Sequence, residues 1–329
     1  MKLSGIKSAE SCHDDSIWAA AWVPPSTSRA TSLLLTGSLD ESVRLWHSDD
    51  LSSAAPPSRG HSLGVVSLAA HPSGSLAAAT SLDSLVRVFD VDTAASVALL
   101  EAAPSEAWGL QFNPKGTLLA VAGGGSATVK LWDTATWQLV DTLAVPRPEG
   151  ARPDRPAPSG IPTGNFILAV AWSPDGRRLA CSSYDGSVAV FDTARAKLLH
   201  HLSGHHMPVR SLVFSPVDPR VLFTGSDDSH VHMYDADGRS LVAAMSGHAG
   251  GVSSVDASPD GAALATGSAD RTVRLWDVGM RAAVQTMANH TDHVWGVAFR
   301  PDTSGAGTRA AGRLASVSDD RSISLYDHS

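Results

Sequence analysis

Histidine, serine and aspartate are the residue types in this sequence that could do chemistry, because they recur together at regular spacing. A His, a Ser and an Asp can form the base, the nucleophile and the orienting acid of a hydrolase. The first set is His13, Ser38 and Asp40. The set in the most regular copy is His248, Ser268 and Asp270. A hydrolase needs one such set, whereas this chain repeats it. We therefore expect no catalytic site, and we interpret the sets as structural networks of hydrogen-bonded polar groups.

Neither a metal site nor a phosphate-binding loop is expected. The densest histidine cluster is His200, His201, His205 and His206. His205 belongs to the repeated sets, and neighbouring strand residues such as His200 and His201 point to opposite faces. No Cys or carboxylate joins them to complete the usual tetrahedral zinc site. The glycines at 123–125 are not followed by the Lys-Ser or Lys-Thr pair of a phosphate-binding loop. No cofactor is therefore expected.

The composition indicates a soluble globular protein that does not bind nucleic acid directly. The chain is 43% hydrophobic and 18% charged, with a formal net charge of −8. Nucleic-acid binding needs Lys and Arg concentrated on one face, and no basic run occurs. Two cysteines, Cys12 and Cys181, are too few for a disulfide framework and indicate a reducing compartment. We find no apolar stretch that predicts a membrane span or a secretion signal, and we expect an intracellular protein.

One pattern repeats seven times and sets the places of these residues. Each copy ends in an aromatic residue six positions after a turn residue, which is Asp in six copies and Ser126 in the third. The aromatic residues are Trp46, Phe89, Trp132, Phe191, Tyr234, Trp276 and Tyr326. Internal repeats of this length predict an array or a ring of similar units.

Each copy predicts a four-stranded antiparallel sheet. Apolar and polar residues alternate, and Gly, Pro, Asn and Asp separate the runs. Such a sheet cannot bury both faces alone, so an all-β, seven-bladed β-propeller is expected over residues 1–329. Residues 1–12 are expected to supply the outermost strand of blade seven and so to close the ring. The expected blades are 13–60, 61–102, 103–144, 163–204, 205–247, 248–289 and 290–329, with a Pro-rich interblade loop at 145–162.

Three tryptophans predict a binding surface near the mouth of the central channel. They share one position, directly after the first apolar residue of an innermost strand, and blade five has an Arg there. Trp and Arg dominate interface hot spots, and apolar turn residues beside them would extend the patch. The predicted partner-binding residues are Trp18, Trp108, Trp295, Leu39, Leu82, Tyr184 and Arg210. The alternative is that the tryptophans only add packing between blades.

The repeats resemble those of the WD-repeat family. In that fold the repeated His bonds to the Ser or Asp side chain and the Trp of the next strand joins, which implies that Trp46 and Trp276 complete the two networks. A closer likeness, to the WD-repeat subunits of superkiller complexes, is carried by the segments 13–18, 60–66, 164–168, 204–212 and 293–297. It extends over all seven blades.

This closer resemblance implies a non-catalytic scaffold in cytoplasmic 3′-to-5′ RNA decay. Because such subunits also belong to the polymerase-associated factor complex, it implies a nuclear role in transcription elongation as well. The partner would be a helical-repeat scaffold subunit, bound at the channel mouth through a short segment with a Gln-Arg pair followed by an apolar residue. We expect a monomer by itself. The loop at 145–162 and an insert at 303–311 look longer than the family pattern, which could change partner choice.

Two alternatives stay open. Substrate receptors of ubiquitin ligases commonly carry an Arg two residues after the blade Asp, and this chain has none there: the positions hold Asp92, Ala135, Ala194, Asp237 and Gly279. A metal-dependent enzymatic propeller needs carboxylates or His converging on the axis, where this chain has mainly Val, Ala, Leu and Ser. A G-protein β subunit fits less well, because it needs an N-terminal helix.

Overall fold

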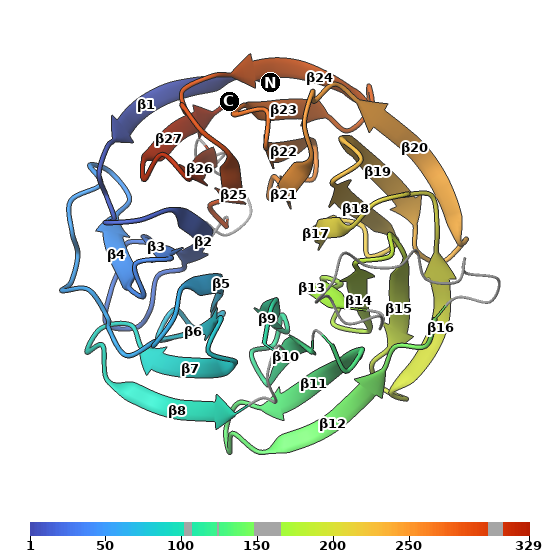
Figure 1. The fold of residues 1–329 in the computed structure, drawn as a ribbon, viewed down its shortest axis with the longest axis horizontal. Coiled ribbons are helices and arrows are strands. Elements are labelled where there is room, and N and C mark those ends of the chain that lie inside the picture. Colours follow the sequence, from blue (N-terminus) through green and yellow to red (C-terminus); the bar gives the residue numbers. More distant parts are fainter. Residues whose placement is uncertain (102–106, 124, 148–165, 302–311) are drawn as a thin grey trace, which may run out of the picture.

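The predicted seven-bladed propeller is confirmed. The computed structural model describes residues 1–101, 107–123, 125–147, 166–301 and 312–329. In these residues the strands form seven antiparallel sheets, arranged in a ring around a common axis (Figure 1). No helix in the described segments is long and apolar enough to cross a membrane. Most of the predicted loop at 145–162, and the insert at 303–311, lie outside the described residues.

The sheets are built in the same way around the ring, from the axis outward. The innermost strands are β2 (Ile17–Val23), β5 (Val65–Ala70), β9 (Leu110–Phe112), β13 (Ile167–Trp172), β17 (Val209–Phe214), β21 (Val252–Ala257) and β25 (Val294–Phe299). The second strands are β3 (Leu33–Ser38), β6 (Leu76–Ser81), β10 (Leu118–Gly123), β14 (Arg178–Ser183), β18 (Val221–Ser226), β22 (Ala263–Ser268) and β26 (Gly312–Ser318). The third strands are β4 (Val43–His47), β7 (Leu85–Asp90), β11 (Thr128–Asp133), β15 (Val188–Asp192), β19 (His230–Asp235), β23 (Val273–Asp277) and β27 (Ile323–His328). The outermost strands are β8 (Ser96–Glu101), β12 (Leu139–Ala144), β16 (Lys197–Leu202), β20 (Ser240–Ser246), β24 (Ala282–Met287) and β1 (Leu3–Ala9).

The core lies between the blades, which explains the composition of the strands. The six residues of β3 are all buried, because this strand is covered on both faces. In the outermost strand β20 most residues are exposed or half-buried, and only Met245 is buried. Each apolar cluster joins two neighbouring blades; one, for example, packs Leu35 and Leu45 of blade one against Val65, Ala79 and Phe89 of blade two. Burial of these faces is the main stabilising contribution of the ring.

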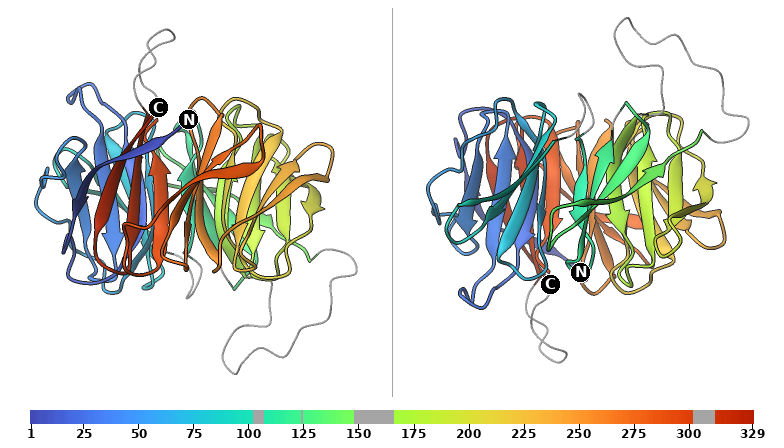
Figure 2. Two further views of the ribbon diagram at one scale, coloured as in Figure 1. Left: turned by 90° about the horizontal axis from the view of Figure 1, so that it is seen from above. Right: turned by 90° about the horizontal axis from the view of Figure 1, so that it is seen from below.

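The first strand closes the ring as predicted. Strand β1 pairs antiparallel with β27, with Leu3 opposite His328 and Ala9 opposite Ile323. Leu3 is 2% exposed, and its backbone N–H and C=O both bond to the Gln285 side chain of blade six at 2.8 Å. Both ends of the chain therefore lie on one face of the disc, as Figure 2 shows. Pairing of the two ends leaves blade seven without an open edge.

Blade one departs from the predicted four strands. Its sheet contains only β2, β3 and β4. Beyond β4 the chain makes two isolated bridges, Val43 to Ser58 and Trp46 to Ser53. Pro56 and Pro57 stand between the two bridge residues, and proline has no backbone N–H to donate to a ladder. The fourth strand is therefore interrupted.

Candidate functional site at the channel mouth

The histidine network of blade one fixes a turn. His13 Nδ1 lies 2.9 Å from Asp40 Oδ2, and His13 Nε2 lies 2.8 Å from Thr36 Oγ1. The Trp46 indole N–H donates to the same threonine oxygen at 2.8 Å. A carboxylate only accepts hydrogen bonds, so Nδ1 carries the proton and the Thr36 hydroxyl donates to Nε2. Burial lowers the pKa of His13, which favours this neutral form.

Blade six repeats the geometry. His248 Nδ1 lies 2.8 Å from Asp270 Oδ2, and its Nε2 lies 2.7 Å from Thr266 Oγ1, to which Trp276 donates at 2.8 Å. Burial alone would raise the pKa of Asp270, but hydrogen bonds, led by the one from Thr272, lower it to about 2. The carboxylate is therefore ionised and serves as a fixed acceptor.

The serines of the two networks do not bond to the histidines. The Ser38 hydroxyl donates to the carbonyl oxygen of Asp15 at 3.0 Å and accepts the N–H of Asp40, and Ser268 makes the equivalent pair of bonds in blade six. Of the two partners that the resemblance allowed, the His therefore takes the Asp and not the Ser. A nucleophile must lie within hydrogen-bond reach of its base. These sets are consequently not arranged as hydrolase triads.

Replacing Asp270 with alanine is expected to lower the free energy of unfolding by about 1–3 kcal/mol, because His248 and its neighbours lose a buried acceptor. Denaturant unfolding measures the change. Asp14→Ala is the control: the Asp14 side chain is 81% exposed and makes only a 3.3 Å contact with Arg44, so its effect should stay within about 0.5 kcal/mol. A variant that stayed fully stable and lost a hydrolytic activity would contradict the structural role.

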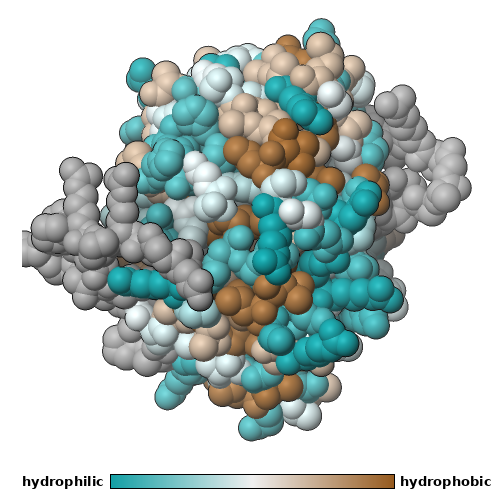
Figure 3. All heavy atoms as spheres, turned by 90° about the vertical axis from the view of Figure 1, so that its right-hand side faces the viewer, coloured by the Kyte–Doolittle hydropathy of each residue, from teal (hydrophilic) through white to brown (hydrophobic). Residues whose placement is uncertain are grey.

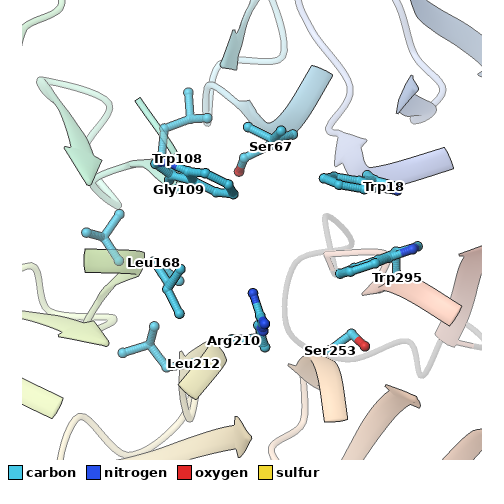
Figure 4. A pocket seen from close by; sticks show the side chains of 14 residues that line it. Trp18, Ser67, Trp108, Gly109, Leu168, Arg210, Leu212, Ser253 and Trp295 are labelled. Carbon is cyan, nitrogen blue, oxygen red and sulfur yellow. The ribbon is translucent and has the colours of Figure 1, made fainter. Parts of the chain in front are cut away.

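A cavity of about 330 Å³ opens at one end of the ring axis. Its rim contains one side chain from each blade at the same place in the repeat, which is the second residue of the innermost strand in six blades and lies two residues before β9 in blade three. These residues are Trp18, Val66, Trp108, Leu168, Arg210, Ser253 and Trp295. In Figure 4, Trp18 and Trp295 lie together on one side, Trp108 lies across from them, and Arg210 points into the space between. We call this surface the channel-mouth cavity.

Trp18 and Trp295 form a stacked pair that is held by one carboxylate. Their ring centroids are 4.7 Å apart and their planes are inclined by 30°. Both indole N–H groups donate to Oδ1 of Asp319, from Trp295 at 2.8 Å and from Trp18 at 3.3 Å. His293 stacks on Trp295 at 4.0 Å, and its Nε2 lies 2.5 Å from the Ser253 hydroxyl. All five residues are half-buried, so this array is held against the ring and still accessible.

The opposite part of the rim combines an ion pair with an apolar wall. The Arg210 guanidinium donates to both carboxylate oxygens of Asp227 at 2.8–3.0 Å. Trp108 packs edge-on against Phe166, with ring centroids 5.2 Å apart, and Leu168 continues the wall. A concave, largely apolar surface with a few oriented polar groups is typical of a binding site.

Three predicted binding residues lie on the same face but do not line the cavity. Leu39, Leu82 and Tyr184 occupy the turns between the second and third strands of blades one, two and four. Leu39 is half-buried and packs closely against Gly64. A β carbon added to that glycine would lie 2.4 Å from Leu39 Cδ2. Leu82 and Tyr184 are 43% and 41% exposed. Their contribution to binding stays a prediction.

Sequence reasoning missed Asp319, His293 and Phe166. A signal for Asp319 was present, since the residue before the turn Asp is charged in blades five and seven and is Leu, Tyr or Ala in blades one, two, four and six. The charged residues at this position, Asp227 and Asp319, both bond to rim side chains of the cavity. His293 and Phe166 carry no comparable signal.

Among the described residues of the outer wall, the exposed apolar side chains are spread over several strands. Exposed apolar side chains of the outermost strands, such as Leu199 and Leu241, lie there. In Figure 3 the hydrophobic residues of one side of the wall form separate groups among hydrophilic ones. Among the described residues, no group of three or more His, Cys, Asp or Glu side chains could hold a metal ion. The channel-mouth cavity is therefore the candidate site.

Comparison with known proteins places the repeats in a family. The family described as WD domain, G-beta repeat matches residues 6–47, 57–90, 96–133, 159–192, 196–235, 239–277 and 282–327. The chain is 65% identical to WD repeat-containing protein VIP3 of Arabidopsis thaliana over 329 residues, all of both chains. It is 30% identical to WD repeat-containing protein SL1-17 of Schistosoma mansoni over 235 residues, 71% of each chain. Periodic tryptophan protein 2 of Arabidopsis thaliana is 30% identical over 52% of this chain and 17% of its own length.

Proposed function

The chain belongs to the WD-repeat family, and from this membership we propose that it is a non-catalytic platform that binds protein partners at the channel-mouth cavity. In blades one and six the repeated His and Asp residues are engaged in fixing turns, which favours the rim of the cavity as the place for function. A propeller suits this role, because its rigid ring presents side chains from all seven blades to one partner segment.

The rim of the cavity is the main support for this proposal. Three tryptophans stand at one repeat position, half-buried and oriented toward a common cavity. Four blades fold with Val, Leu, Arg or Ser at that position, so folding does not require Trp there. Half-exposed Trp and Arg side chains around a concavity are the usual anchors of protein interfaces.

We further propose the complexes in which the platform works. The resemblance to superkiller WD-repeat subunits supports a role in cytoplasmic 3′-to-5′ RNA decay and in the nuclear polymerase-associated factor complex. The partner would be a helical-repeat scaffold subunit with a Gln-Arg segment followed by an apolar residue, which suits the apolar wall at Trp108 and Leu168. Outside such complexes the chain would be a monomer without direct contact to nucleic acid or membrane.

Affinity purification of the tagged chain from its source tests this assignment. We expect one helical-repeat protein to be recovered in near-stoichiometric amount from both cytoplasmic and nuclear extracts, together with RNA-decay subunits in the first and elongation subunits in the second. Mass spectrometry of the eluates identifies them, with a tagged, unrelated propeller as the control. Recovery of ubiquitin-ligase subunits in their place would contradict the assignment to these complexes.

A further inference from the structure

The orientation of the aromatic pair at the cavity depends on a single turn. Asp319 lies between β26 and β27, and its backbone N–H donates to the carbonyl oxygen of His293 at 2.9 Å. On one side of it the Ser318 hydroxyl donates to the backbone of Asp292 at 3.1 Å, and on the other side Asp320 bonds to His290 and to Ser322. The Asp319 carboxylate is therefore presented from a backbone that is fixed on both sides.

The two indoles that meet this carboxylate come from different blades. Trp295 belongs to β25 of blade seven and Trp18 to β2 of blade one. Both rings are half-exposed, so burial alone does not select their rotamers. Because one oxygen of Asp319 accepts both N–H groups, it sets the rotation of both rings and thereby their 4.7 Å stacking. The carboxylate thus joins the first and last blades at the surface where a partner would bind.

The fold itself does not require a carboxylate at this position. The equivalent residues of four other blades are Leu39, Leu82, Tyr184 and Ala269, and their turns form with the same backbone bond as in blade five, where the residue is Asp227. The turn is fixed by the following residue, Asp320, which is the repeated aspartate. The role of the Asp319 side chain therefore lies in its hydrogen bonds to the aromatic pair.

We propose that Asp319 is a positioning residue of the partner-binding site: it holds Trp18 and Trp295 in the stacked arrangement before a partner arrives. This inference rests on the proposed function, because it assigns a role within that site. A site whose anchors are already ordered loses less conformational entropy on binding. Asp319 acts through the rings, and both N–H groups are engaged with it, so a partner meets the exposed ring carbons and not the N–H groups.

Three single variants test the role. Asp319→Asn keeps an oxygen that accepts both N–H groups, Asp319→Ala removes it, and Asp292→Asn removes a negative charge from an exposed position on the same face. Two readouts are compared: the indole ¹H–¹⁵N resonances of Trp18 and Trp295 in the free protein, and the affinity for a synthetic peptide with a Gln-Arg pair followed by an apolar residue. Trp18→Phe and Trp295→Phe assign the resonances among the nine tryptophans.

We expect Asp319→Ala to shift and broaden both resonances and to weaken peptide binding by about tenfold or more, since the rings must then be ordered by the peptide. Asp319→Asn and Asp292→Asn should bind within about threefold of the unmodified protein, the range of a lost surface charge. Equal losses for the Asn and Ala variants would show an effect of charge and would overturn the positioning role.

Failure of this inference is distinguishable from failure of the proposed function. If Asp319→Ala disturbs the indole resonances and still binds the peptide normally, or leaves the resonances unchanged, the positioning role is wrong while the site stands. If the unmodified protein does not bind the peptide, both are wrong for this class of ligand.

Discussion

Deletion of residues 1–11 is expected to lower the free energy of unfolding by about 3–6 kcal/mol, a large part of the 5–15 kcal/mol margin of a typical domain. The deletion removes the buried side chain of Leu3, worth roughly 2 kcal/mol, and the backbone ladder between β1 and β27. It also leaves Gln285 of blade six without its two bonds to Leu3. Denaturant unfolding followed by tryptophan fluorescence measures the change.

The exposed edge of β27 gives this deletion a second signature. An unpaired edge strand can pair with another chain, so size-exclusion chromatography should show self-association that the full chain lacks. Two point variants keep the test usable if the truncated chain does not fold. Leu3→Ala should destabilise by about 2–3 kcal/mol, whereas Ile6→Ala, at a position that is 40% exposed on the same strand, should have a small effect. An unchanged melting temperature after the deletion would be incompatible with ring closure as a source of stability.

The parts of the fold that could be predicted are those with local causes. The turn Asp, the following aromatic residue and the opening His recur within one blade, so each copy carries the information for its own sheet. Ring closure was predictable too, because the last blade lacked a strand that the first residues could supply. The interrupted fourth strand of blade one has a cause in the sequence, Pro56 and Pro57. The expectation of four strands in every blade took no account of these two prolines.

The parts that could not be predicted depend on contacts between distant residues. The hydroxyls of Thr36 and Thr266 donate to the histidine and accept from the tryptophan of their networks, but a threonine in a strand is common and shows no such role in the sequence. Asp319 meets Trp18 across 301 residues of chain, and only the closed ring brings them together. The rim position was predictable because every blade repeats it, whereas a carboxylate before the turn Asp occurs only in blades five and seven.

The double variant Trp18→Ala/Trp295→Ala is expected to weaken partner binding by at least about 30-fold, corresponding to roughly 2 kcal/mol for the loss of a hot-spot anchor. The fold should survive, because both rings are half-exposed and the pair contributes about 1 kcal/mol of stacking beyond its buried area. Isothermal titration with the purified helical-repeat partner, or with the Gln-Arg peptide, measures the affinity, and circular dichroism checks the fold.

A control variant far from the cavity shows whether the loss of binding is specific to the cavity. Lys115→Glu reverses a charge in the exposed turn between β9 and β10, at the opposite end of the innermost strands, and should leave binding unchanged. Arg29, in the loop between β2 and β3 at the same end, would be a poor control, because its guanidinium bonds to the carbonyl oxygens of Pro24 and Gly74 and pairs with Asp92.

Trp108→Ala provides an independent measurement from the other side of the cavity, since Trp108 packs on Phe166 and makes no contact with the stacked pair that would couple the two changes. If the double variant unfolds, the loss of binding by Trp108→Ala decides the question. If the double variant and Trp108→Ala both lose binding, the partner segment must span the cavity. Normal binding by folded variants of both sides would mean that the tryptophans serve packing between blades, and the binding surface would have to be sought elsewhere on the propeller.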